Sequence, residues 1–175
     1  TCNVGAASPE AYGDVFAWGE TVAKSSYDWN TYSDNPSGDG LTFTKYATNK
    51  KTLLDPSDDA ARISWGSTWR IPTVAEWNAL LNTSNFDWDW DDVRKGYKVT
   101  SKVSGYVGNS IFLPAAGFWY PGPIFRGRWG YYWSSSLTEE DSRLAWCVTI
   151  DSEKAMIEDG GYPRCRGISV RPVSE

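Results

Sequence analysis

The pattern of apolar and polar positions predicts short helices in the first half of the chain. Thr73 and Glu76 form a capping box, and an apolar stripe at helical spacing follows it: Val74, Trp77, Leu80 and Leu81. We expect this stripe to face the core. A second helix is predicted over 55–62, where acidic residues suit a helix N-terminus and Gly66 can end it.

From about residue 95 the period changes to the alternation typical of strands. Residues 144–150 are apolar on both faces, so we expect them to form a buried central strand. The predicted class is α+β, with an antiparallel sheet, long loops and one domain spanning 1–175. The predicted strands are 97–103, 110–113, 131–136, 144–150 and 167–172.

The segment 118–133 crowds eight aromatic rings and two arginines among glycines and prolines, so much of it should be loop. Tyr132 and Trp133, like Trp146, lie in strand-like stretches and are predicted to face inward. The rings flanked by Pro, Gly or Arg are predicted to face outward: Trp119, Tyr120, Phe125 and Trp129. A second loop over 156–166 carries one ring, Tyr162, and two arginines, Arg164 and Arg166, and such residue types dominate binding hot spots.

Charge and composition narrow the function classes. The net charge of −5 gives no electrostatic case for nucleic acid, and no apolar run is long enough to span a bilayer. Histidine, the commonest general base and zinc ligand, is absent. The three cysteines form no CxxC pair, and a Cys147–Cys165 bridge stays open.

The motifs that carry catalytic or metal chemistry are incomplete. The acidic run 87–92 resembles a calcium loop, but Asp92 and Lys98 occupy positions where an EF-hand needs Gly and Glu. We interpret the run as a solvated acidic turn with its two Trp rings tucked inward. Ser134 to Ser136 lack a His to activate them, and the acids at 139–141 are more typical of solvated charge than of a glycosidase pair. We therefore predict no enzyme, no metal and no cofactor.

Five segments, taken in order, resemble the Fibrobacter succinogenes major paralogous domain family: 16–20, 69–77, 109–117, 131–136 and 169–173. The resemblance covers nearly the whole chain. It implies a C-type lectin-like fold and a secreted or surface protein of gut-type bacteria, and the end at Thr1 reads as processed. Segment 69–77 is also similar to a signature of formylglycine-generating enzymes, which share that fold.

The resemblance also bears on function. The tripeptides with which sugar-binding C-type lectins hold calcium do not occur here. Formylglycine-generating enzymes use two late cysteines, so an oxidase using Cys147 and Cys165 is an alternative, although the surrounding motif does not match. Lectin-fold proteins diversified by retroelements vary in their C-terminal part. Here the segments unlike the family scaffold are 118–131, 138–143, 147–154 and 157–166.

We therefore predict a non-catalytic, extracellular or cell-surface domain that binds a protein or glycan on another cell or surface. A structural cell-surface module is a further alternative. The predicted ligand-binding residues lie between 117 and 175: Phe118, Trp119, Tyr120, Phe125, Arg126, Arg128, Trp129, Tyr131, Arg143, Lys154, Glu158, Tyr162, Arg164 and Arg166.

Overall fold

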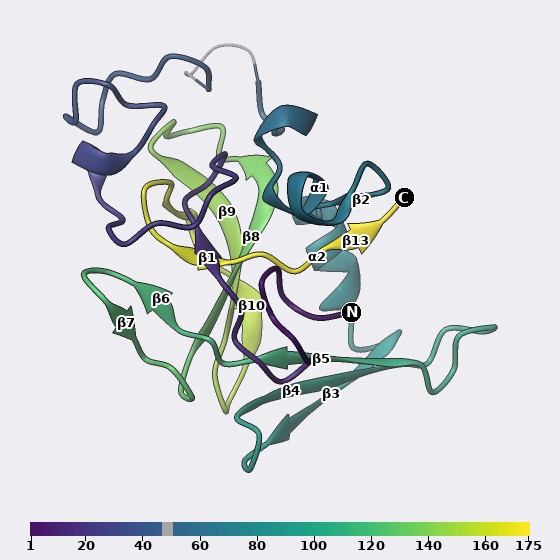
Figure 1. The fold of residues 1–175 in the computed structure, drawn as a ribbon. Helices are drawn as coiled ribbons and strands as arrows, with labels where there is room; N and C mark the ends of the chain where they lie inside the picture. Colours follow the sequence, from purple (N-terminus) through teal and green to yellow (C-terminus); the bar gives the residue numbers. More distant parts are fainter. Residues whose placement is uncertain (47–50) are drawn as a thin grey trace.

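A six-stranded sheet forms the centre of the molecule in the computed structural model, which describes residues 1–46 and 51–175 (Figure 1). β11 (Tyr162–Pro163) pairs with the beginning of β9 (Leu144–Ile150), opposite Leu144 and Ala145, whereas β10 (Ala155–Ile157) pairs with the end of β9. The pairing of β12 with β8 is parallel, whereas β9 pairs antiparallel with β8, β10 and β11, and β1 pairs antiparallel with β12. The order of the main path is β1 (Val15–Phe16), β12 (Ile168–Ser169), β8 (Gly130–Leu137), β9 (Leu144–Ile150) and β10 (Ala155–Ile157).

Three smaller sheets surround the central one. β3 (Phe86–Asp91), β4 (Gly96–Ser101) and β5 (Ser110–Pro114) form an antiparallel sheet that lies low in the view of Figure 1. The loop between β4 and β5 projects to the right of that view. The β6–β7 hairpin lies at the left, at the opposite end. The two-stranded sheets are β2 (Trp69–Arg70) with β13 (Val173–Ser174), and β6 (Phe118–Trp119) with β7 (Pro123–Ile124).

The helices are short, and their starts follow from side-chain caps. The capping box before α2 (Val74–Leu80) is confirmed: Glu76 N donates to Thr73 Oγ1 (3.2 Å), and Thr73 N donates to the Glu76 carboxylate (2.8 Å). α1 (Ala60–Trp65) begins later than predicted, because Asp59 caps it by accepting from the next backbone amides. Two 3₁₀ turns complete the set, η1 (Trp29–Thr31) and η2 (Pro56–Asp58).

The central sheet is covered on both faces, as alternation along β8 requires. Trp133 belongs to the core cluster that holds Trp18 on one face, whereas Tyr132 belongs to the cluster that holds Trp77 and Val148 on the other. Both side chains are fully buried, which confirms the inward prediction for them. The prediction for Trp146 is wrong, because its ring is half-buried and borders a hollow of about 640 Å³ with Glu139, Glu140 and Asp159.

The acidic run 87–92 is mostly strand rather than turn. In β3 the rings of Trp88 and Trp90 pack edge-on against Tyr97, with centroids 5.4 and 5.2 Å away, while Asp87 and Asp89 are exposed. The inward placement of the two rings is therefore confirmed. The predicted strand 167–172 is shorter, since only Ile168–Ser169 pairs there and the chain pairs again at β13.

The α+β class is confirmed in its coarse form, as mostly small β-sheets with a few short helices. Within the described part of the chain, no helix has the length and apolar character to cross a membrane.

Candidate functional site

The loop from 118 to 129 is fastened at its base by backbone hydrogen bonds. Gly117 N donates to Trp129 O (2.7 Å), and Trp119 N donates to Gly167 O (2.8 Å). Gly117 adopts φ 69°, and a Cβ there would lie 2.1 Å from Ile124 O, so only glycine fits. These bonds hold the loop against the chain segment that follows β11.

Five predicted rings meet in one cluster, here called the ring cluster. The centroid of Phe118 lies 5.1 Å from that of Tyr131, 5.7 Å from Tyr162 and 5.9 Å from Phe125. Trp129 stacks on Tyr131 at an interplanar angle of 14°, with centroids 6.2 Å apart. The cluster therefore joins the 118–131 segment to the 156–166 segment through direct aromatic contacts.

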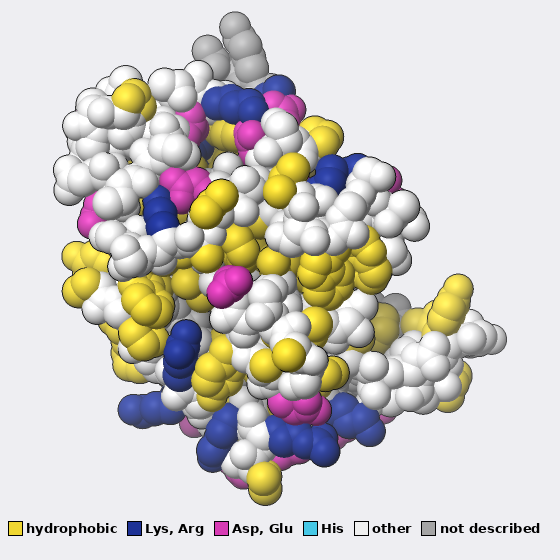
Figure 2. Space-filling view, viewed as in Figure 1, with side chains coloured by type: hydrophobic (Ala, Val, Ile, Leu, Met, Phe, Trp, Pro, Cys, Tyr) yellow, Lys and Arg dark blue, Asp and Glu magenta, His cyan; other side chains and the backbone are white. Residues whose placement is uncertain are grey.

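The solvent exposure of the rings increases across the ring cluster, from the core to the surface. Tyr131 is buried within the main core, Phe118, Trp129 and Tyr162 pack against that core half-buried, and Phe125 is 45% exposed. Phe125 also adopts φ 59°, a left-handed conformation that is costly for a bulky residue. Figure 2 shows hydrophobic side chains gathered at the left edge, over the β6–β7 hairpin, with Lys and Arg side chains below them.

The outward prediction holds for two of its four rings. Tyr120 is 44% exposed, and Phe125 is exposed as described above. Trp119 is half-buried instead and packs beside Tyr27, with ring centroids 6.4 Å apart. Trp129 is half-buried because the ring of Tyr131 stacks on one face of its indole ring.

The arginines around the ring cluster differ in their partners. The Cζ atom of Arg166 lies 3.3 Å from the ring centroid of Tyr120, and that of Arg126 lies 5.5 Å from the ring centroid of Tyr12. Tyr12 was not predicted, since no pattern in the sequence links it to Arg126. Exposed Arg128 borders a hollow of about 370 Å³, whose lining also includes Trp90, Trp129, Asp92, Asp151 and Glu153.

Arg164 is not a surface residue, so its predicted role in binding is wrong. Its side chain is 0% exposed, and its guanidinium donates to Asp34 Oδ2 and to Tyr46 O, both at 2.7 Å. The Cζ atom lies 4.1 Å from the ring centroid of Phe43. Arg164 therefore ties the 156–166 segment to the N-terminal loops.

Three further residues that are predicted to bind the ligand make no ring contact within the ring cluster. Arg143 is exposed, but its guanidinium is committed to Asp141 in its own loop, at 2.6 to 3.0 Å. Lys154 is exposed in the turn after β9, where its amide donates to Asp151. Glu158 is half-buried, and its amide donates to Cys147 O.

Burial controls the protonation of the tyrosines in the cluster. It raises the pKa of Tyr162 to about 12, with the positive charge of Arg166 opposing the shift and Glu158 adding to it. Burial likewise raises the pKa of Tyr131, and Tyr162 and Glu158 add to that shift. Both hydroxyl groups are neutral at physiological pH, as ordinary tyrosines are, and burial moves their ionisation further from that pH.

The two late cysteines are free and buried in different core clusters. Burial raises the pKa of Cys147 well above its usual range, and it raises that of Cys165 to about 11. The thiolate is the reactive form of cysteine, so both side chains are present as neutral thiols near pH 7. This environment lends no support to the oxidase alternative.

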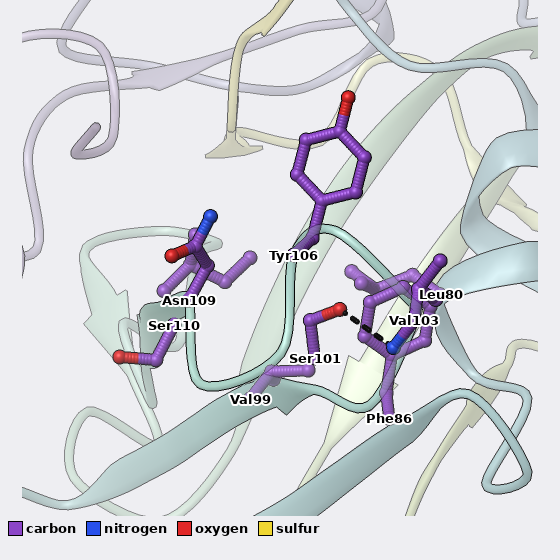
Figure 3. A pocket seen from close by; sticks show the side chains of 9 residues that line it. Leu80, Phe86, Val99, Ser101, Val103, Tyr106, Asn109 and Ser110 are labelled. Carbon is purple, nitrogen blue, oxygen red and sulfur yellow. Dashed lines mark hydrogen bonds between the residues drawn. The ribbon is translucent and has the colours of Figure 1, made fainter.

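Several hollows lie away from the ring cluster. One of about 380 Å³ is lined by apolar residues of α2 and the β3–β5 sheet, among them Leu80, Phe86 and Ile111. Figure 3 shows Tyr106 standing on the β4–β5 loop at its rim, and Ser101 Oγ accepting from Val103 N (3.1 Å). Across residues 1–46 and 51–175, no three Cys, Asp or Glu side chains gather as metal ligands do.

Comparison with family models, with curated proteins and with solved structures finds no match to this chain.

Proposed function

We propose that this chain is a C-type lectin-like domain that binds a macromolecular partner and performs no catalysis. The observation that carries the proposal is the ring cluster, with exposed Phe125 at its edge and with Tyr120 and Arg166 beside it. The partner is a protein or glycan on another cell or surface, which makes the domain extracellular or surface-attached.

The packing of the rings favours binding over a purely structural role. Half-buried Phe118, Trp129 and Tyr162 are fixed by one another, so little side-chain freedom is lost when a partner covers them. The left-handed backbone at Phe125 presents a large apolar ring to water, an arrangement that folding alone does not favour. Aromatic rings and arginine are also the residue types on which binding energy concentrates.

We further propose that this face is diversified by a retroelement. The two segments that build the ring cluster, 118–131 and 157–166, are among those that differ from the family-like scaffold. The scaffold residues Tyr132 and Trp133 are fully buried, so changes at the exposed edge of the ring cluster spare the centre of the core. Sequencing the genomic neighbourhood tests this: a reverse transcriptase and a template repeat are expected, and their absence contradicts it.

The binding proposal is tested by presenting the immobilised domain to a glycan array and to a displayed library of random peptides. Ligands are expected that bind the native domain and not a Tyr120→Ser/Phe125→Ser double variant. Tyr106→Ser is the matched control, because Tyr106 is 64% exposed on the β4–β5 loop, at the other end of the view in Figure 1. If no ligand is found, or if the double variant binds equally well, the proposal is wrong.

A further inference from the structure

Two arginines beside the ring cluster have guanidinium groups that the protein holds but does not neutralise. Among the residues that the structure describes, neither Arg126 nor Arg166 has a carboxylate within 4.0 Å or a side-chain hydrogen bond. Elsewhere on the surface, Arg70 donates to Glu76 at 2.6 and 2.7 Å, and Arg143 is held by Asp141. Arg126 and Arg166 differ from these two arginines in keeping their guanidinium donors unpaired.

Aromatic rings position both groups. The Cζ atom of Arg166 lies 3.3 Å from the ring centroid of Tyr120, and the Cζ atom of Arg126 lies 5.5 Å from the ring centroid of Tyr12. A guanidinium that rests on a ring uses its flat face, whereas its N–H donors point outward in the plane of the group. The close contact with Tyr120 therefore restricts the guanidinium of Arg166 and leaves its N–H donors available to an acceptor, whereas Arg126 lies farther from its ring with its donors equally available.

The positions of the two guanidinium groups indicate what kind of ligand they bind. Arg126 follows exposed Phe125 directly, and Arg166 stacks on exposed Tyr120. We propose that this face binds a carboxylate-bearing segment of a protein, with Arg126 and Arg166 each accommodating one carboxylate and Phe125 packing on an apolar residue between them. This inference rests on the proposed function and names the chemistry of its partner.

The neighbouring acids do not occupy the two groups. Asp92 accepts from Trp90 Nε1 (3.1 Å) and lies 3.4 Å from Lys95 Nζ, and Asp151 accepts from backbone amides in its own turn. Exposed Glu153 lines the hollow at Arg128, and half-buried Glu158 is next to the tyrosines of the cluster. Among the described residues, Arg126 and Arg166 therefore remain without an ion pair, as does neighbouring Arg128, on a chain whose net charge is −5.

Phe125 decides between a protein and a polyanionic saccharide. Its side chain has no polar atom, so covering it is favourable only when the partner supplies apolar surface. A sulfated saccharide offers anionic groups and hydroxyls, whereas an acidic protein segment offers carboxylates and apolar side chains together. The exposed ring next to Arg126 therefore favours the protein.

The test selects displayed random peptides on the native domain and measures the affinity of the enriched sequences. We expect peptides with acidic residues around an apolar residue, and affinity that falls about tenfold or more in Arg126→Lys/Arg166→Lys. Lysine keeps the charge but loses the planar group, so this variant separates paired hydrogen bonding from general attraction. The matched control is Arg94→Lys, since Arg94 is exposed on the β3–β4 turn with Asp91 3.7 Å away.

Three results would overturn this inference. The first would be enriched peptides that are neutral or basic, and the second would be equal affinity of the lysine variant and the native domain for the enriched peptides. The third would be displacement of the peptides by heparin, with heparin binding equally to the native and lysine forms. If Phe125→Asn binds the peptides more weakly and the lysine variant binds them normally, the proposed function stands and only the role of the arginines is refuted. If neither peptides nor glycans bind, the proposed function itself fails.

Discussion

Arg164 and Arg166 are separated by one residue, yet their guanidinium groups meet opposite surroundings. The guanidinium of Arg164 is enclosed between Asp34, Tyr46 and Phe43, so its charge is compensated inside the protein. That of Arg166 lies on Tyr120 at the surface without a carboxylate. Residue type alone does not separate the two roles, because the partners of Arg164 lie more than 100 positions away in the chain.

Replacing each of these arginines by alanine should give different results at the residue scale. Arg164→Ala leaves Asp34 nearly buried without its partner, so we expect the free energy of unfolding to fall by about 3–5 kcal/mol. Arg166→Ala removes a surface contact, and we expect a change within about 0.5 kcal/mol. Urea titration of both variants measures this, and equal effects would contradict the assignment of Arg164 to the core.

The loop between Gly117 and Gly130 is the element that carries the rings, and its base depends on close backbone contacts. Gly117 and Gly122 both adopt left-handed φ values, 69° and 98°. A Cβ at Gly117 would meet Ile124 O, whereas a Cβ at Gly122 would meet nothing within 4 Å. The two glycines therefore share a backbone requirement and differ in packing.

Alanine at these two glycines separates the two costs. Gly122→Ala should lower the free energy of unfolding by about 1 kcal/mol, the conformational penalty alone. Gly117→Ala must also displace the backbone at Ile124, and we expect a loss of more than about 2 kcal/mol with an altered near-ultraviolet circular dichroism of the rings. Similar losses in both variants would show that the base of the loop is less tightly packed than described.

Helix α2 gives a prediction about acid stability. The Arg70 guanidinium lowers the pKa of Glu76 to about 2, from an ordinary value of 4.5. The ionised carboxylate therefore stabilises the folded state above about pH 4.5, and this contribution is lost as the pH falls towards 2. Since Glu76 is 42% exposed, solvent screening limits the contribution to about 1 kcal/mol or less.

Comparing Glu76→Gln with the native domain tests this titration. The native domain should unfold at higher urea concentration than the variant at neutral pH, and this difference should shrink as the pH falls below about 4.5 and vanish only below about pH 2. If the difference in unfolding urea concentration between the two proteins stays constant from neutral pH to about pH 2, Glu76 is not the group that titrates.

Elements with a local signal could be predicted from the sequence. The capping box at Thr73 and the alternation along β4 depend on neighbouring residues, and both are confirmed. The acidic run 87–92 is interpreted as a solvated turn once the calcium-loop template fails, but it lies mostly in β3, where its Trp rings alternate towards Tyr97. The two-residue strands, such as β12 and β13, carry too few residues to show a period.

The ring cluster is a property of the whole molecule. Phe118 and Tyr162 meet because β11 pairs with the far end of β9 and because Gly167 accepts a hydrogen bond from Trp119. The residue types at the two loops indicated a binding face, but the burial of Tyr131 and Arg164 depends on tertiary partners that the sequence pattern does not reveal. The central claim is that the exposed edge of this cluster contacts a partner.

The most direct test measures the affinity of one selected ligand for Phe125→Asn and for Tyr106→Asn, together with the free energy of unfolding of each. Asparagine tolerates the left-handed backbone at position 125, so the fold is retained. We predict that Phe125→Asn weakens binding by at least about 2 kcal/mol while its stability changes by less than about 1 kcal/mol, and that Tyr106→Asn binds normally. Unchanged affinity in Phe125→Asn would contradict the claim that the ring cluster is the binding face.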